Sequence, residues 1–149
     1  MDQQYDVVIC GGGLAGLTLG LQLRRELPQL SVMILERTKR PLPAAAHKVG
    51  ESAVELGSMY FDDLGLQANL GQRHLRKLGL RFFPGGGLLP LHKRAELGAT
   101  DEPRVVSYQI DRGVFEQDLR GIAQEHGVTL IEGATATDVT FGEGEAPHR

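Results

Sequence analysis

The stretch VVICGGGLAGLTLG, residues 7–20, decides the fold, because a β-branched run passes directly into a glycine-rich turn and then into a leucine-rich segment. Gly11, Gly13 and Gly16 form the pattern G-x-G-x-x-G. The first glycine permits a tight turn, the second lets a pyrophosphate approach the backbone, and the third lets a helix pack on a strand. The stretch therefore predicts a loop whose backbone amides bind the phosphates of a dinucleotide.

The flanking residues supply the secondary structure that this pattern requires. Residues 5–10 predict a buried strand, residues 14–27 a helix ended by Pro28, and residues 31–35 a second strand. Together they predict a βαβ unit with a parallel sheet. The free N–H groups and the dipole at the helix N-terminus favour an anion there. The cradle residues are Gly11, Gly12, Gly13, Leu14, Ala15 and Gly16.

Glu36 ends the second predicted strand, twenty residues after Gly16. A carboxylate at this position can accept hydrogen bonds from both ribose hydroxyls and would repel a 2′-phosphate, which disfavours NADP. The alternative interpretation is that the glycines serve only a tight turn. The strand, helix and acid at the proper spacing favour dinucleotide binding over that alternative.

Composition narrows the class of protein. The 149 residues are 41% hydrophobic and 23% charged with a net charge of −3, which is typical of a globular protein and gives no reason to expect nucleic acid as a partner. Cys10 is the single cysteine and the five histidines are scattered, so no metal site is predicted. No apolar run approaches the length of a membrane span, and the N-terminal residues are acidic, so we expect a cytoplasmic protein with no membrane partner.

The rest of the chain predicts an α/β domain of residues 1–149 with a Rossmann-like parallel sheet and an inserted β-hairpin. The turn PGGG predicts that hairpin within residues 78–91. Asp111 is a candidate N-cap for the last predicted helix. Because the turn at residues 142–149 has no returning strand after it, we expect an incomplete domain. The predicted helices are 51–64, 66–75 and 111–126, and the further strands are 104–110, 128–132 and 134–141.

Three segments resemble FAD-dependent monooxygenases of the glutathione-reductase-like fold, and most closely flavin-dependent halogenases. They are the glycine-rich stretch with ILER after it, KVGES at 48–52, and residues 108–139, in which Asp111-Arg112 opens a second strand–helix–strand unit. The resemblance implies FAD as the cofactor. It also implies that Arg112 lies beside the FAD phosphates, that residues 134–139 lie by the adenine, and that Gly50, Glu51 and Ser52 lie near the cofactor.

The residues alone leave several of these roles open. Arg112 could equally be a solvated residue of a first helical turn, although first turns prefer acids. Arg37 could contact the adenosine portion or face water. Glu51 and Ser52 could serve as the first-turn acid and the N-cap of the helix at 51–64.

The stretch HLRKLGLRFF, residues 74–83, resembles the halogenase segment that carries a lysine between flavin and substrate. Lys77 matches that lysine. The resemblance implies that reduced flavin and oxygen oxidise a halide to hypohalous acid, which Lys77 then holds and delivers to an electron-rich substrate. The alternative is that Lys77 belongs to a solvated basic cluster. The sequence also departs from the tryptophan-halogenase pattern, because Phe83-Pro84 stands where an Asn-Trp pair is common.

The leading prediction is therefore the FAD-binding part of an oxygen-using flavoenzyme, a halogenase or a related monooxygenase. Its expected partners are a small-molecule substrate, a halide ion and a separate flavin reductase. Two alternatives stay open. One is a flavin-dependent reductase or dehydrogenase on the same fold, and the other is a dinucleotide-binding module without catalysis.

Overall fold

The computed structural model describes residues 4–144 and 146–148. These residues form two compact units. The first, which we call the sheet unit, consists of Met1–His47 and Asp111–Arg149, and the second, the inserted unit, consists of Lys48–Ile110. Each unit is described by itself below.

The sheet unit contains a three-stranded parallel sheet in the order β1-β2-β5. Its β-branched strands place Val32 and Ile34 in the core, as expected for a strand with neighbours on both edges and helices against it. The chain enters β2 from β1 through a helical crossover, so the predicted βαβ unit is confirmed. The elements are β1 (Val7–Cys10), α1 (Leu14–Glu26), β2 (Val32–Glu36), α4 (Arg112–Glu125) and β5 (Thr129–Glu132).

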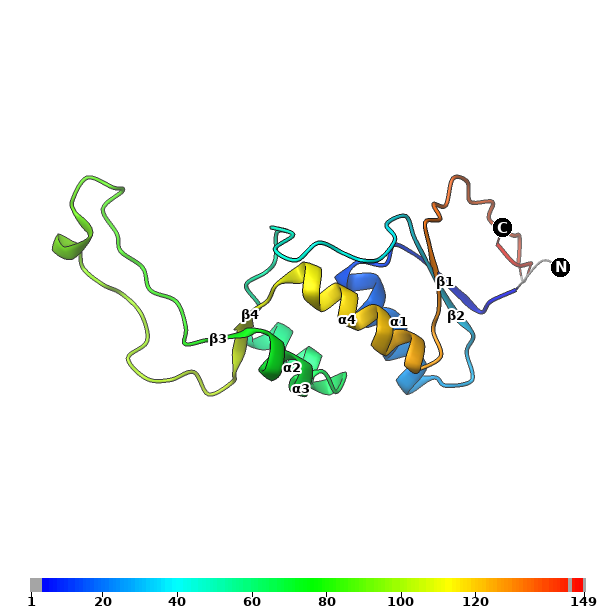
Figure 1. The fold of residues 1–149 in the computed structure, drawn as a ribbon, viewed down its shortest axis with the longest axis horizontal. Helices are drawn as coiled ribbons and strands as arrows, with labels where there is room; N and C mark the ends of the chain where they lie inside the picture. Colours follow the sequence, from blue (N-terminus) through cyan, green and yellow to red (C-terminus); the bar gives the residue numbers. More distant parts are fainter. Residues whose placement is uncertain (1–3, 145, 149) are drawn as a thin grey trace. The chain divides into compact units, whose positions relative to one another are not determined.

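Helices α1 and α4 pack side by side in the sheet unit (Figure 1). Leu17 and Leu21 of α1 are fully buried, as are Phe115 and Leu119 of α4. Asp111 caps α4, because its side chain accepts a hydrogen bond from the Val114 N–H at 3.1 Å. The predicted N-cap is thus confirmed, and it fixes the point at which α4 begins.

The inserted unit combines two short helices with an antiparallel pair of strands. Strand β3 pairs with β4 so that Lys77 lies opposite Ser107. Residues 78–106 form the long connection between the two strands, with a 3-10 turn at Leu91–Lys93 (Figure 1). The elements are α2 (Glu55–Asp63), α3 (Gln67–Arg73), β3 (Leu75–Lys77) and β4 (Ser107–Gln109).

The predicted hairpin within residues 78–91 is wrong in its pairing. Gly85, Gly86 and Gly87 all adopt positive φ angles, so the reversal is present, but it is wider than a two-residue turn and its flanks do not pair. Phe82 pairs instead with Leu97 through two backbone hydrogen bonds of 2.8 and 2.9 Å. The antiparallel pair inserted in this fold is β3–β4.

Two further strand predictions need correction. Residues 134–141 form no strand, because a strand needs a hydrogen-bonded neighbour and no segment among residues 4–144 and 146–148 pairs with them. Strand β4 lies beside β3 and not in the parallel sheet, so only α4 and β5 of the second predicted strand–helix–strand unit belong to the sheet unit.

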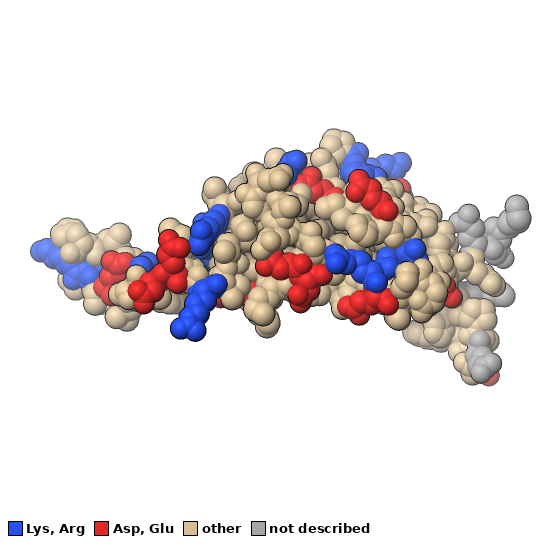
Figure 2. All heavy atoms as spheres, turned by 90° about the horizontal axis from the view of Figure 1, so that it is seen from below, with Lys and Arg blue, Asp and Glu red and all other residues tan. Residues whose placement is uncertain are grey.

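The surface carries charges of both signs. On the face that Figure 2 shows, lysine and arginine side chains are interspersed with aspartate and glutamate side chains. Within the described part of the chain, no helix has both the length and the apolar character needed to cross a membrane.

Candidate dinucleotide site

The glycine-rich loop joins the end of β1 to the start of α1. Gly11 has a φ of 122°, a conformation that favours glycine, and its N–H donates to the Leu35 carbonyl at 2.8 Å. Gly13 is the N-cap of α1 and has no side chain of its own to cap the helix. A Cβ built on Gly13 would meet only Glu116 Oε1, at 3.9 Å, so the space in front of this residue is open to a ligand.

Gly16, the third glycine of the pattern, and Gly20, one turn farther along α1, serve packing. A Cβ on Gly16 would lie 1.9 Å from the Gly11 carbonyl oxygen, so helix α1 can approach the loop only because Gly16 has no side chain. A Cβ on Gly20 would lie 2.9 Å from Ile34 Cδ1. The structure therefore shows the turn at Gly11 and the close packing at Gly16 that the motif predicts.

Glu36 ends β2 directly behind the glycine-rich loop. Its Oε2 accepts a hydrogen bond from the Gly12 N–H and its Oε1 accepts one from the Thr38 N–H, both at 2.7 Å. Burial alone would raise the pKa of Glu36, but these backbone bonds and the charge of Arg120 hold it below its ordinary value. The Glu36 carboxylate is consequently ionised at neutral pH and fixed in position.

Arg120 of α4 supports this carboxylate from inside the protein. It is 2% exposed, and its guanidinium donates to the Thr38 carbonyl at 2.8 Å and to Glu132 Oε1 at 2.6 Å. Its other terminal nitrogen lies 3.9 Å from Glu36 Oε1. Arg40 binds the second carboxylate oxygen of Glu132 at 3.0 Å. Arg120 thus lies between two acids at the ends of adjacent strands.

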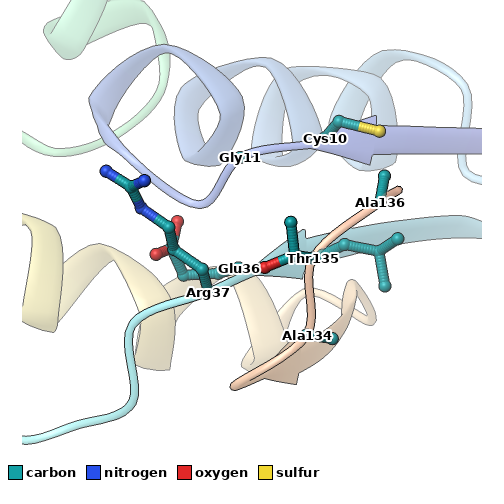
Figure 3. Close-up of a pocket in the computed structure, with 8 residues that line it drawn as sticks. Cys10, Gly11, Glu36, Arg37, Ala134, Thr135 and Ala136 are labelled. Carbon is teal, nitrogen blue, oxygen red and sulfur yellow. The ribbon is translucent and has the colours of Figure 1, made fainter. Parts of the chain in front are cut away.

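A cavity of about 210 Å³ opens beside Glu36 at the ends of β1 and β2. Figure 3 shows how residues from β1, from the end of β2 and from the segment after β5 surround it. This segment turns over β2, because the N–H groups of Gly133 and Ala134 both donate to the Glu36 carbonyl, at 2.6 and 3.1 Å. The lining residues are Cys10, Gly11, Leu35, Glu36, Arg37, Ala134, Thr135 and Ala136.

Arg112 lies in the first turn of α4, within the same unit as the glycine-rich loop. Its guanidinium forms an ion pair with Glu116, one turn farther along the helix. The same oxygen of Glu116 accepts a hydrogen bond from the Leu14 N–H at 3.3 Å. Arg112 therefore reaches the N-terminal end of α1 through Glu116.

The predicted site residues of the inserted unit form a second cluster. Glu51 and Ala53 flank β4, because the Glu51 carbonyl accepts from the Ile110 N–H at 2.6 Å and the Ala53 N–H donates to Tyr108 at 2.9 Å. Ser52 bridges to Gln109. Lys77 is half-buried, and its Nζ donates to the Ala53 carbonyl at 2.8 Å. Gly50, with a φ of 90°, turns the chain just before this segment.

One alternative for these residues is wrong. Helix α2 begins at Glu55 with Val54 as its N-cap, so neither Glu51 nor Ser52 caps it. The backbone of residues 51–53 is instead engaged along the edge of β4.

Sequence reasoning missed Glu116 and Arg120, which are 1% and 2% exposed. Both lie in α4 next to the buried apolar stripe of Phe115, Leu119 and Ala123. Their position beside such a stripe could have indicated that they are buried, and a buried charge is retained only when it is paired. The cavity-lining residues Cys10 and Leu35 were also not predicted as part of the site, whereas Thr135 lies within residues 134–139, which the resemblance placed by the adenine.

These features fit a dinucleotide. The loop leaves room beside Gly13 for a phosphate, α1 directs its N-terminus there, and a fixed carboxylate borders a cavity at the ends of the strands. Of the six cradle residues, Gly11, Gly12 and Leu14 use their amides within the protein. Among residues 4–144 and 146–148, no group of three or more metal-binding side chains gathers.

We expect Glu36→Ala to weaken FAD binding by about 1–3 kcal/mol, the value of a charged hydrogen bond. The variant removes the carboxylate that borders the cavity, and isothermal titration with FAD measures the loss. Glu132→Gln is the matched control, because Glu132 also binds Arg120 but does not line the cavity. An equal loss in both variants would show that Glu36 acts only through Arg120.

Known proteins resemble this chain in sequence. A family described as an FAD binding domain matches residues 4–146. The chain is 31% identical over 146 residues to the flavin-dependent halogenase chlA of Dictyostelium discoideum, covering 87% of this chain and 23% of that protein. It is 35% identical over 104 residues to the mitochondrial L-2-hydroxyglutarate dehydrogenase of Caenorhabditis elegans, covering 69% of this chain and 23% of that protein. The chain therefore spans about a quarter of the length of these relatives.

Solved structures of halogenases share the fold. A triple mutant of the flavin-dependent brominase Bmp2 superposes with a TM-score of 0.73 at 26% identity, covering 93% of this chain and 32% of the brominase. The myxobacterial chondrochloren halogenase CndH superposes with a TM-score of 0.74 at 25% identity, covering 93% of this chain and 31% of the halogenase.

Proposed function

Because this chain belongs to the FAD binding domain family, we propose that it forms the FAD-binding part of a flavin-dependent halogenase or a closely related monooxygenase. The proposed substrate is an electron-rich small molecule. The observation that carries the proposal is the likeness to halogenases, which appears both in sequence, at 31% identity, and in structure, at 25% and 26% identity.

The proposed roles in the sheet unit follow the geometry of the loop and the cavity. The open space at Gly13 and the N-terminus of α1 receive the diphosphate, with Arg112 as the neighbouring cation. Glu36 accepts hydrogen bonds from the ribose hydroxyls. Arg37 and residues 134–136, which line the cavity with Glu36, contact the adenosine portion.

FAD, when bound and reduced, supplies the electrons for activating oxygen. The proposed role of Lys77 is to bind hypohalous acid through its ammonium group and present the halogen to the substrate. An ammonium suits this role because it is a compact donor. The hydrogen bond from Nζ to the Ala53 carbonyl gives the side chain a defined position, and it associates Lys77 with residues 50–52, the other predicted site residues of the inserted unit.

The proposed partners follow from this chemistry. A halide ion is the second substrate, and a separate flavin reductase supplies reduced FAD, as the resemblance to halogenases implies. The sequence of 149 residues contains one G-x-G-x-x-G pattern followed by a helix, which the FAD accounts for.

A second candidate is a flavin-dependent dehydrogenase. The likeness to L-2-hydroxyglutarate dehydrogenase, at 35% identity over 104 residues, favours it. This candidate needs neither halide nor Lys77.

The proposal is tested by assaying the complete protein with reduced FAD, oxygen, bromide and a panel of phenols and indoles. We expect a brominated product detected by mass spectrometry. A hydroxylated product that forms with or without bromide would identify a monooxygenase. An oxidised substrate that has gained neither bromine nor an oxygen atom from O2 would identify a dehydrogenase.

A further inference from the structure

Glu116 places a buried negative charge at the N-terminus of α1, where a diphosphate is expected. Its side chain is 1% exposed, and Oε1 accepts a hydrogen bond from the Leu14 N–H at 3.3 Å. The same oxygen would lie 3.9 Å from a Cβ on Gly13. An acid in this position stabilises the helix N-terminus but also opposes a second anion, so its presence needs a reason.

Arg112 supplies that reason. Its side chain is 19% exposed and forms an ion pair with Glu116 across one turn of α4. A cation in the first turn of a helix faces the positive end of the dipole, which disfavours it there. The carboxylate of Glu116 offsets that effect and ties the guanidinium to the start of α1. A guanidinium carries several N–H donors in a planar fork, so it can bind a carboxylate and a phosphate oxygen together.

Several amides of the glycine-rich loop already donate to acceptors within the protein, which increases the expected contribution of Arg112 to binding a diphosphate. The N–H groups of Gly11, Gly12 and Leu14 donate to the Leu35 carbonyl, Glu36 and Glu116 respectively. Three of the six cradle amides thus donate to acceptors within the protein, so the positive charge that faces a diphosphate depends more on the α1 dipole and on a nearby cation. The cation in contact with this end of α1, through Glu116, is Arg112.

We propose that Glu116 is a positioning residue for the cofactor diphosphate, which acts by holding the Arg112 guanidinium at the N-terminal end of α1. This inference rests on the proposed binding of FAD at the glycine-rich loop and deepens it. Glu116 itself does not contact the cofactor. Its carboxylate binds Arg112 on one side and the Leu14 amide on the other.

The test compares ligands with and without a diphosphate in the complete protein. Adenosine, ADP and FAD are titrated into the wild type and into Glu116→Gln, which keeps an oxygen acceptor for Leu14 but removes the charge that holds Arg112. We expect affinity for ADP and FAD to fall about tenfold, and affinity for adenosine to change less than about twofold. Glu125→Gln, in the exposed last turn of α4, is the matched control and should bind all three ligands as the wild type does.

A double-mutant cycle shows whether Glu116 acts through Arg112. In an Arg112→Met background, adding Glu116→Gln should cause no further loss of ADP affinity. If Glu116→Gln does not fold, as judged by circular dichroism, Glu116→Asp replaces it. This variant keeps the charge but shortens the reach by one methylene, so ADP affinity should still fall while adenosine affinity is retained.

Three results would overturn the proposal. Equal losses for adenosine and ADP would assign Glu116 a purely structural role. Tighter binding of ADP by Glu116→Gln would show that the carboxylate merely repels the diphosphate. Additive losses in the cycle would separate Glu116 from Arg112. Because these are binding measurements, they stand apart from the halogenation assay, whose failure would leave them unchanged.

Discussion

Gly13→Val is expected to leave the protein folded and to reduce FAD affinity by about two orders of magnitude or more. Gly13 has a φ of −84° and a ψ of −173°, an extended conformation that valine adopts readily. A Cβ there meets nothing closer than 3.9 Å within the protein, so the new side chain enters the space proposed for the diphosphate. Fluorescence titration with FAD, together with thermal unfolding, measures both effects.

Gly16→Val is the contrasting variant from the same motif. Its Cβ would lie 1.9 Å from the Gly11 carbonyl oxygen, a backbone atom that cannot move without displacing α1 from β1. We expect it to destabilise the fold by about 3 kcal/mol or more. Unimpaired FAD binding by the Gly13 variant would locate the diphosphate elsewhere. Equal loss of folding in both variants would show that Gly13 also serves packing.

The glycine-rich loop could be predicted from sequence because its determinants are local. Gly11, Gly13 and Gly16 lie within six residues, and the spacing to Glu36 follows from the length of one helix and one strand. Each glycine meets a local requirement of that unit: a positive φ at Gly11, open space at Gly13 and close packing at Gly16. The parallel pairing of β1 with β2 follows from the same crossover.

The inserted unit was predicted less well because its pairing is not local. Three consecutive glycines predicted a reversal near residue 86, but Phe82 pairs with Leu97, and β3 pairs with β4 about thirty residues later. Strand β4 also makes backbone hydrogen bonds to residues 51–53, and such long-range contacts cannot be read from the local sequence. Local propensity therefore identified the turn and could not identify the partner.

The buried charges of α4 form a third case. Glu116 and Arg120 resemble surface residues in sequence, and their roles appear only when α1 and β2 are brought against α4. Arg120 fixes Thr38, whose N–H binds Glu36, so the carboxylate predicted from the motif depends on a residue more than eighty positions away. Tertiary packing, and not the motif alone, sets the geometry of this site.

Lys77→Ala in the complete protein is expected to lower the yield of brominated product about a hundredfold or more. FAD binding and the oxidation of reduced FAD by oxygen should stay unchanged. The separation follows from the proposed role, because the ammonium acts on hypohalous acid after the oxygen has been consumed. The halogen passes to a carbon of the substrate, and the hydroxide leaves with the substrate proton as water. Without the Lys77 ammonium, hypohalous acid still forms but is not held next to the substrate.

Arg76→Ala tests the alternative that Lys77 is one member of a solvated basic cluster. Arg76 is the neighbouring residue of β3, its side chain is 50% exposed, and it pairs with Glu102 at 3.1 Å. Because side chains alternate along a strand, it lies on the opposite face from Lys77. We expect Arg76→Ala to brominate as the wild type does. Oxygen consumption and product mass are measured for both variants, and unchanged bromination by Lys77→Ala would return this lysine to the basic cluster.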